Sequence, residues 1–154
     1  MDKEFAGSGA SGDVSRSVWV TLRNTAENGL AGGALEFFLR TELREGTALA
    51  PASLLISWLP MPRGLAPPAE VFAEELSERR SSDHSADADV DVVDMPAGRT
   101  VRVCTATTLD HHVRIPGDAG YLHLAFSLPL SGTKSSMGNL CDAMAQSLRW
   151  VPGR

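Results

Sequence analysis

The amino-acid sequence predicts a single α+β domain built on an antiparallel sheet of about five strands with three packed helices. Several short segments place apolar residues at alternate positions, which is the period of a half-buried strand. Other segments place them three and four residues apart, the period of an amphipathic helix. A length of 154 residues fits one domain. We therefore expect residues 17–154 to form the domain, after a flexible, glycine-rich tail at residues 1–16.

The first half of the chain is expected to contribute two strands and one helix. A strand is predicted at residues 18–22, where β-branched residues alternate with others. Leucines four residues apart predict a helix over residues 34–45, which Gly46 ends. The apolar run at residues 53–59 is flanked by prolines and predicts a short strand covered on both faces.

A helix and a hairpin are expected next. The helix is predicted to begin at Pro67–Pro68, because proline suits the first turn and apolar residues follow at helical spacing. Alternation over residues 90–93, and again over residues 99–107, predicts two strands. They are expected to pair as an antiparallel hairpin across the turn at residues 95–98.

The remaining chain is expected to hold a loop, a strand and a helix. Residues 108–120 are interpreted as a long connecting loop. Residues 121–128 form the clearest strand of the sequence, with apolar residues at every second position on one face. The last helix is expected to begin at a cap, Ser135 or Ser136, and to stop before Pro152. Three consecutive strands favour an antiparallel meander with the helices packed on it.

The composition excludes several classes of partner. The net charge of −5 provides no positive field for phosphate backbones or anionic lipids, so neither nucleic acid nor a membrane is an expected partner. The first residues show no targeting signal, and no apolar run reaches the roughly 18–20 residues of a spanning helix, so we expect a cytoplasmic protein. Cys104 and Cys141 are expected to be reduced core thiols. The excess of Arg over Lys is typical of a bacterial genome rich in G and C.

Two motif-like patterns are interpreted as accidental. Residues 7–12 spell G-x-G-x-x-G, but a dinucleotide site needs a strand immediately before that motif. Residues 87–94 contain alternating aspartates, but a calcium-binding EF-hand needs glycine and glutamate where this sequence has Val92 and Gly98. We therefore expect no cofactor, and interpret the aspartates as the solvated face of a strand.

The cluster best suited to catalysis or metal binding consists of Asp110, His111 and His112. Two imidazoles beside a carboxylate are suited to holding zinc or to general-base chemistry, with Arg114 holding an anion. Adjacent side chains in an extended segment point apart, however, and the sequence has no H-x-x-x-H or C-x-x-C spacing. We expect a surface loop with no metal and no catalytic residue. A small-molecule-binding protein or an enzyme that uses the 108–120 loop is the alternative.

Five further residues are candidates for a binding surface, because Trp, Tyr and Met favour interface cores and the alternation leaves them uncovered. They are Trp19, Trp58, Met61, Leu65 and Tyr121. His111 and His112 complete the candidate set. In the alternative, the first five residues pack in the protein's own hydrophobic core, and the sequence leaves both possibilities open.

The second half of the chain resembles the PsbP-like α/β/α sandwich. The residues that carry the resemblance are 90–93, 101–105, the strand Leu122-x-Leu124-x-Phe126-x-Leu128-Pro129, and 140–150. The chain is also similar to uncharacterised actinobacterial proteins with a tryptophan-containing first strand and a Leu-Arg-Trp ending. The resemblance rests on element order and carries over no functional residue.

The resemblance to PsbP-like domains implies a binding or assembly role, because such domains generally do not act as enzymes. Many of them are exported, whereas this sequence shows no signal. We therefore expect a non-catalytic protein-interaction module, an adaptor, chaperone-like or assembly component of a bacterial complex. Its partner is expected to be another protein or a second copy of itself.

Overall fold

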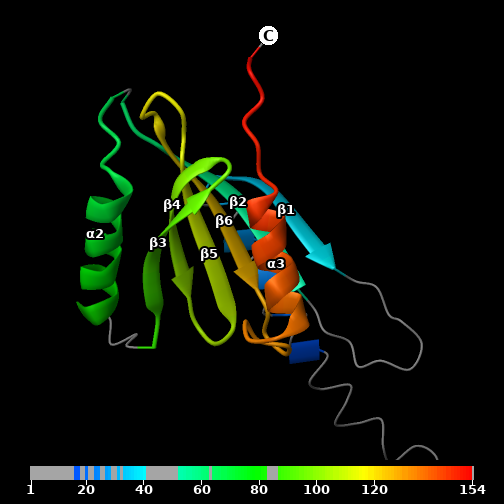
Figure 1. Ribbon diagram of the computed structural model, residues 1–154. Helices are drawn as coiled ribbons and strands as arrows, with labels where there is room; N and C mark the ends of the chain where they lie inside the picture. Colours follow the sequence, from blue (N-terminus) through cyan, green and yellow to red (C-terminus); the bar gives the residue numbers. More distant parts are fainter. Residues whose placement is uncertain are drawn as a thin grey trace, which may run out of the picture.

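The structure is a computed structural model that describes residues 16–17, 20, 23–24, 27–28, 31, 33–40, 52–62, 64–82 and 87–153. Its centre is a six-stranded antiparallel sheet (Figure 1). The strands are β1 (Ala34–Arg40), β2 (Ala52–Pro60), β3 (Asp89–Met95), β4 (Gly98–Cys104), β5 (Thr108–Arg114) and β6 (Gly120–Ser127). Across the sheet they follow the order β1-β2-β6-β5-β4-β3. The α+β class and the antiparallel sheet expected from the sequence are confirmed.

The sheet joins a hairpin to a meander. β1 and β2 form the hairpin, and β3 to β6 form the meander, each strand pairing with the next. The two parts meet where β2 pairs with β6, from Ser53 opposite Ser127 to Pro60 opposite Gly120. Gly120 has a φ of 130°, and a Cβ at this position would collide with the carbonyl group of Leu59. Glycine is therefore required at this end of the strand pair.

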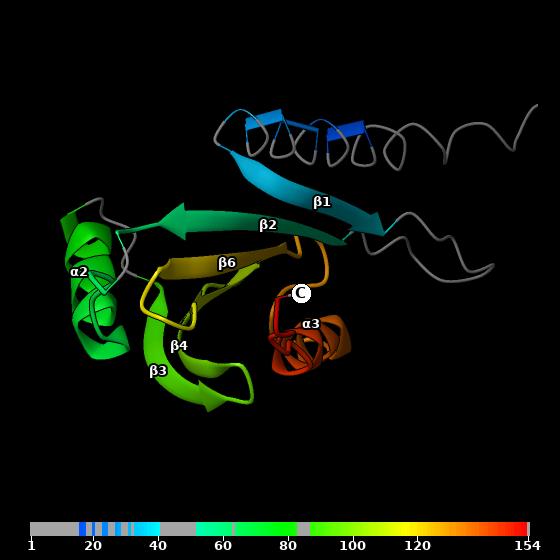
Figure 2. The ribbon, with the colours of Figure 1, turned by 90° about the horizontal axis from the view of Figure 1, so that it is seen from above.

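Two helices are complete in the described part of the chain, α2 (Ala69–Ser82) and α3 (Ser136–Gln146). They cover opposite faces of the sheet (Figure 2). Val101 and Val103 of β4 pack with α2, whereas Leu109 and Val113 of β5 pack with α3. Successive strand residues alternate between the two faces. We call them the α2 face and the α3 face.

Each helix begins where the sequence predicts. α2 follows Pro67–Pro68 and buries Phe72 against the sheet, and Glu70 in its first turn lies 2.8 Å from the guanidinium of Arg99. α3 is capped by Ser135, whose hydroxyl accepts a hydrogen bond of 3.2 Å from the backbone N–H of Gly138. The cap satisfies one of the free N–H groups at the helix start.

The helix predicted over residues 34–45 is wrong, because residues 34–40 form strand β1. Residues 41–45 lie outside the described residues. A spacing of four is a multiple of two, so leucines four apart share one face of a strand as well as one stripe of a helix. Pairing with β2 decides between the two, since it provides hydrogen-bond partners for the backbone groups of β1 that face β2. The sheet therefore has six strands where about five were expected.

The strand predicted at residues 18–22 is contradicted at Val20, the one residue of that range that the structure describes. Val20 is helical, as are Arg16, Arg23 and Glu27 around it, and the Arg23 Nε lies 2.7 Å from Glu27 one turn later. β-branched residues lower helix propensity by only a few tenths of a kcal/mol, so they do not exclude a helix. The other residues of that prediction, and residues 1–15 of the predicted tail, lie outside the described part. The single-domain organisation stays a prediction.

The predicted loop at residues 108–120 is wrong for most of its length. Residues 108–114 form β5, and a short connection at residues 115–119 leads into β6. The polar residues Asp110 and His112 suggested a loop. They occupy the α2 face of the strand, where Asp110 has a hydrogen-bond partner and His112 packs against aromatic rings. Polar residues that have partners can therefore occupy a regular strand, so polar composition alone does not identify a loop.

Candidate functional site

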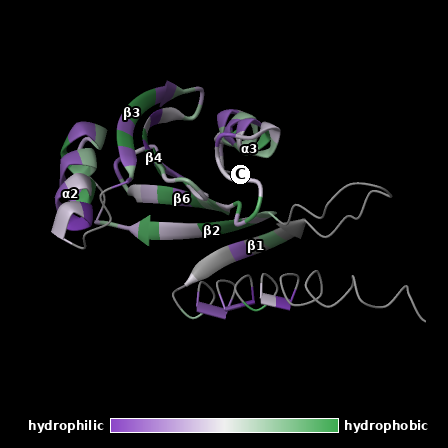
Figure 3. Ribbon diagram, turned by 90° about the horizontal axis from the view of Figure 1, so that it is seen from below, coloured by the Kyte–Doolittle hydropathy of each residue, from purple (hydrophilic) through white to green (hydrophobic). Residues whose placement is uncertain are grey.

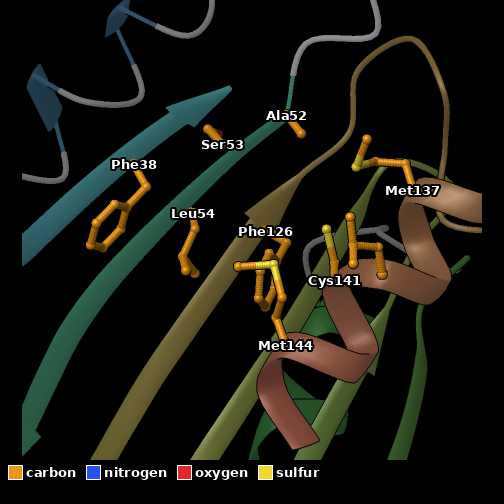
Figure 4. A pocket seen from close by; sticks show the side chains of 9 residues that line it. Phe38, Ala52, Ser53, Leu54, Phe126, Met137, Cys141 and Met144 are labelled. Atoms are coloured by element: carbon orange, nitrogen blue, oxygen red, sulfur yellow. The ribbon is translucent and has the colours of Figure 1, made fainter. Parts of the chain in front are cut away.

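An apolar cavity of about 290 Å³ opens between α3 and the β1–β2–β6 end of the sheet (Figure 4). Its lining comprises Phe38, Ala52, Ser53, Leu54, Phe126, Met137, Leu140, Cys141 and Met144. None of these residues carries a charge. The size is near the lower end of the range for small-ligand pockets.

The walls of the cavity follow from strand register and helical spacing. Phe38, Leu54 and Phe126 are successive register partners on β1, β2 and β6, so they form one row across the α3 face. The helix supplies residues at positions 137, 140, 141 and 144, which form a stripe of one helix face. Figure 4 shows the row and the stripe facing each other across the cavity.

The floor of the cavity is buried and its rim is exposed. Phe126 and Cys141 are buried, whereas Phe38, Leu140 and Met144 are 51%, 50% and 49% exposed. Burial raises the pKa of the Cys141 thiol, so this group stays protonated at neutral pH and acts as apolar wall. Most residues of α2, in contrast, are hydrophilic (Figure 3). The rim is thus a local concentration of large apolar side chains in contact with water.

A polar cluster lies on the α2 face across β2, β6 and β5. His123 Nε2 lies 2.7 Å from Asp110 Oδ1, and His123 Nδ1 lies 3.4 Å from the Ser57 hydroxyl. With the proton on Nε2, His123 donates to the carboxylate and its Nδ1 accepts from the serine. All three groups are partly buried. The contacts join a serine, a histidine and a carboxylate in series, as in the catalytic triad of serine hydrolases.

His112 supports this cluster through its ring. It stacks on His123 with centroids 4.3 Å apart and meets Phe72 of α2 edge-on at 5.3 Å. Burial, helped by the neighbouring His123, lowers the pKa of His112 to about 3. A neutral imidazole therefore packs here as an aromatic side chain.

His111 points to the opposite face and is fully buried against α3. Its Nε2 lies 2.9 Å from Asp142 Oδ1, and the Nε of Arg102 donates to the same oxygen at 3.3 Å. Burial lowers the pKa of His111, although Asp142 opposes the shift. The two adjacent imidazoles thus lie on different faces, as expected for an extended segment, and they do not converge on one site.

No group of His, Cys, Asp or Glu suited to a metal ion occurs among the described residues. Arg114, the expected anion holder, donates to the carbonyl of Ala66 at 3.0 Å and pairs with Asp118 at 3.0 Å. The structure therefore gives Arg114 a role in fixing the connection that precedes α2.

The four other candidate binding residues that the structure describes do not gather on one surface. Trp58 and Leu65 are 48% and 70% exposed, and Met61 is partly buried. Tyr121 is fully buried, stacks on Phe72 and donates its hydroxyl hydrogen to the carbonyl of Pro67 at 2.6 Å. Trp19 lies outside the described residues. None of the described candidates lines the cavity.

Sequence reasoning missed the rim residues Phe38, Leu140 and Met144. Phe38 falls in the segment predicted as a helix, and Leu140 and Met144 fall in the apolar stripe of the last predicted helix, to which no binding role was given. The available signal was the width of that stripe, since positions 140 and 144 extend it beyond the residues that the sheet covers.

No protein-family model, curated protein or solved structure matches the chain. The resemblance to PsbP-like domains therefore stays a prediction. Within the described residues, no helix combines the length and the apolar character needed to cross a membrane.

Proposed function

We propose that the protein is a non-catalytic interaction module whose binding surface is the apolar cavity and its rim. The observation that carries the proposal is the set of large apolar side chains, Phe38, Leu140 and Met144, that stand half-exposed around an uncharged cavity. Such concentrations of exposed apolar surface mark sites of association. The proposed occupant is an apolar segment of a partner protein.

The side-chain types support this kind of occupant. Aromatic residues and methionine are enriched at the centres of protein interfaces, and methionine adapts its shape to different neighbours. Covering the exposed half of each rim side chain would contribute roughly 1 kcal/mol per residue. The absence of charge from the cavity lining disfavours an ionic ligand, because a buried charge without a partner is costly.

The test is an affinity purification from the native organism with matched baits. Wild type, Leu140→Glu, Met144→Glu and Val151→Glu are compared by quantitative mass spectrometry. Val151 is 86% exposed and lies outside the cavity, so it controls for the added charge. The proposal expects a stoichiometric partner that both cavity variants lose and Val151→Glu retains. Equal capture by all baits, or a bound metabolite released by denaturing the wild type, would contradict it.

A bait with Leu65→Glu separates the cavity from the surface that the sequence indicates. Leu65 is 70% exposed and does not line the cavity. Loss of the partner from this bait, with retention by Leu140→Glu, would move the binding surface to the region of Leu65 and would contradict the cavity assignment.

The polar cluster supports a second candidate function, hydrolysis of an ester or amide. Ser57 is the nucleophile of this hypothesis, and His123, oriented by Asp110, takes its proton as Ser57 Oγ attacks the carbonyl carbon. The ester or amide bond then breaks, and the leaving alcohol or amine takes the proton from His123. A water molecule, deprotonated by His123, hydrolyses the acyl-serine, which releases the carboxylic acid and restores the Ser57 hydroxyl. A fluorophosphonate probe that labels wild type and Ser127→Ala but not Ser57→Ala would support hydrolysis. Absence of labelling on the wild type would reject it.

A further inference from the structure

The methionines that the structure describes differ in how much of their side chains meets water. Met95 is buried, and Met61 and Met137 are partly buried. Met144 is 49% exposed and is the one exposed methionine among the described residues. A reagent dissolved in water therefore meets the side chain of Met144 more readily than those of the other three.

Met144 also belongs to the binding surface proposed above. Its side chain lines the uncharged cavity, and Figure 4 shows it pointing from α3 toward the residues of the strands. Phe126, which lines the same cavity, is buried, so Met144 stands between an apolar floor and water. A change in the polarity of Met144 thus acts directly on the apolar surface that a partner would cover.

The second sulfur-containing side chain at the cavity floor is protected from oxidation. Hydroperoxides oxidise a cysteine through its thiolate form. Cys141 is buried, and burial raises the pKa of its thiol, so little thiolate forms at neutral pH. A thioether needs no deprotonation, because the lone pair of its sulfur is the reacting group. An oxidant at the cavity is therefore expected to react at Met144 before it reacts at Cys141.

We propose that Met144 is a site of reversible oxidation, at which a hydroperoxide converts the thioether to the sulfoxide and thereby weakens binding at the cavity. The sulfur lone pair attacks the hydroxyl oxygen of the peroxide and forms an S–O bond as the O–O bond breaks. The hydroxyl proton moves to the departing oxygen, which leaves as water or an alcohol. Sulfur loses two electrons, and the peroxide gains them. The inference rests on the proposed interaction role of the cavity and adds its regulation.

The sulfoxide differs from the thioether in polarity more than in size. Its oxygen is a hydrogen-bond acceptor that water solvates as long as the side chain stays half-exposed. A bound apolar segment would displace that water and leave the oxygen without a donor, which costs free energy. Oxidation of Met144 is therefore expected to raise the Kd of an apolar ligand about tenfold.

The test uses hydrogen peroxide as the oxidant and N-phenyl-1-naphthylamine, an uncharged fluorescent probe of apolar sites, as the ligand. The purified chain carries Cys104→Ser, which removes the partly exposed thiol. Peptide mapping at timed intervals is expected to find Met144 oxidised several-fold faster than the other three described methionines. Fluorescence titration is expected to show about tenfold weaker probe binding after oxidation. Methionine sulfoxide reductases A and B together are expected to restore the affinity.

Two substitutions separate Met144 from other sites of oxidation. Met144→Leu keeps an apolar side chain of similar volume, so it is expected to bind the probe equally well before and after peroxide treatment. Met61→Leu is the matched control, because Met61 does not line the cavity, and this variant is expected to lose affinity on oxidation as wild type does.

Three results would overturn the inference: equal loss of affinity in oxidised Met144→Leu and oxidised wild type, full retention of affinity by wild type oxidised at Met144, or no probe binding by reduced wild type. The first two leave the cavity proposal standing. Failure of the cavity proposal itself is identified separately, by equal capture with all baits in the affinity purification.

Discussion

Asp142 of α3 accepts a hydrogen bond from His111 of β5 at 2.9 Å, although apolar residues make up most of the contact between this helix and the sheet. Arg102 of β4 lies 3.3 Å from the same carboxylate oxygen. One side chain of the helix is thereby joined to two adjacent strands. This position fixes where α3 lies over the sheet, and so it fixes one wall of the cavity.

Asp142→Ala is expected to lower the free energy of unfolding by roughly 1–3 kcal/mol, because it leaves His111 Nε2 buried without its acceptor. Urea denaturation followed by circular dichroism measures the change. Asp91→Ala, at an exposed position of β3, is the control and is expected to shift stability by less than about 0.5 kcal/mol. Equal effects of the two substitutions would show that the contact contributes nothing.

His112 is expected to make the protein less stable as the pH falls below about 6.5. Its pKa is about 3 in the folded chain, so an unfolded chain with an ordinary histidine pKa near 6.5 binds more protons between those values. The free energy of unfolding therefore decreases as pH drops through this window, by up to about 1.4 kcal/mol per pH unit for one group. Denaturation of wild type and His112→Phe at pH 7, 6, 5 and 4 tests it. The variant retains an aromatic ring and should show a shallower dependence; an identical slope would rule out His112 as its source.

Gly138→Ala is expected to destabilise the protein although alanine favours helices. A Cβ at this position would collide with the backbone of Thr133, which precedes the helix. The cost of such overpacking is typically about 1–3 kcal/mol, which outweighs the gain of about 1 kcal/mol in helix propensity. Calorimetry compares it with Gly153→Ala, where the added carbon meets open space. A rise in Tm for Gly138→Ala would refute the contact.

Cys141 is expected to react with iodoacetamide several-fold more slowly than Cys104. Cys141 is buried and burial raises its pKa, whereas Cys104 is partly exposed. Peptide mapping at timed intervals gives the two rates, and Cys104→Ser isolates the slower one. Faster reaction at Cys141 would mean that the cavity floor is open to reagents.

The sequence predicted those elements whose period is unambiguous. The β3–β4 hairpin, β6 and both complete helices follow from alternation or from three-and-four spacing. β1 was missed because its leucines, four residues apart, satisfy both the helical and the strand period. β5 was missed because Asp110 and His112 are polar residues typical of loops, although both have partners on the sheet. Only pairing with residues far along the chain resolves such segments.

The candidate sites were less accessible to sequence reasoning than the fold. The cavity is a space that α3 and three strands fail to fill, and no single segment encodes it. Likewise, Ser57, Asp110 and His123 come together only because β2 pairs with β6 and β6 with β5. Neither arrangement follows from local spacing, since both depend on register between distant strands.

The pairing of β2 with β6, which we call the seam, also affects the order in which the chain folds. Ser57 and His123 face each other across it although they are 66 residues apart in sequence, whereas the hairpins of the β3–β6 meander close over a few residues. Closing a long loop costs more entropy than closing a short one, so contacts across the seam are expected to form late. Pulsed hydrogen exchange should protect the amides of β4 and β5 before those of β2. Leu54 and Phe126 belong to opposite sides of that seam, so the cavity takes shape only in the final stage of folding, and the newly made chain cannot use it earlier.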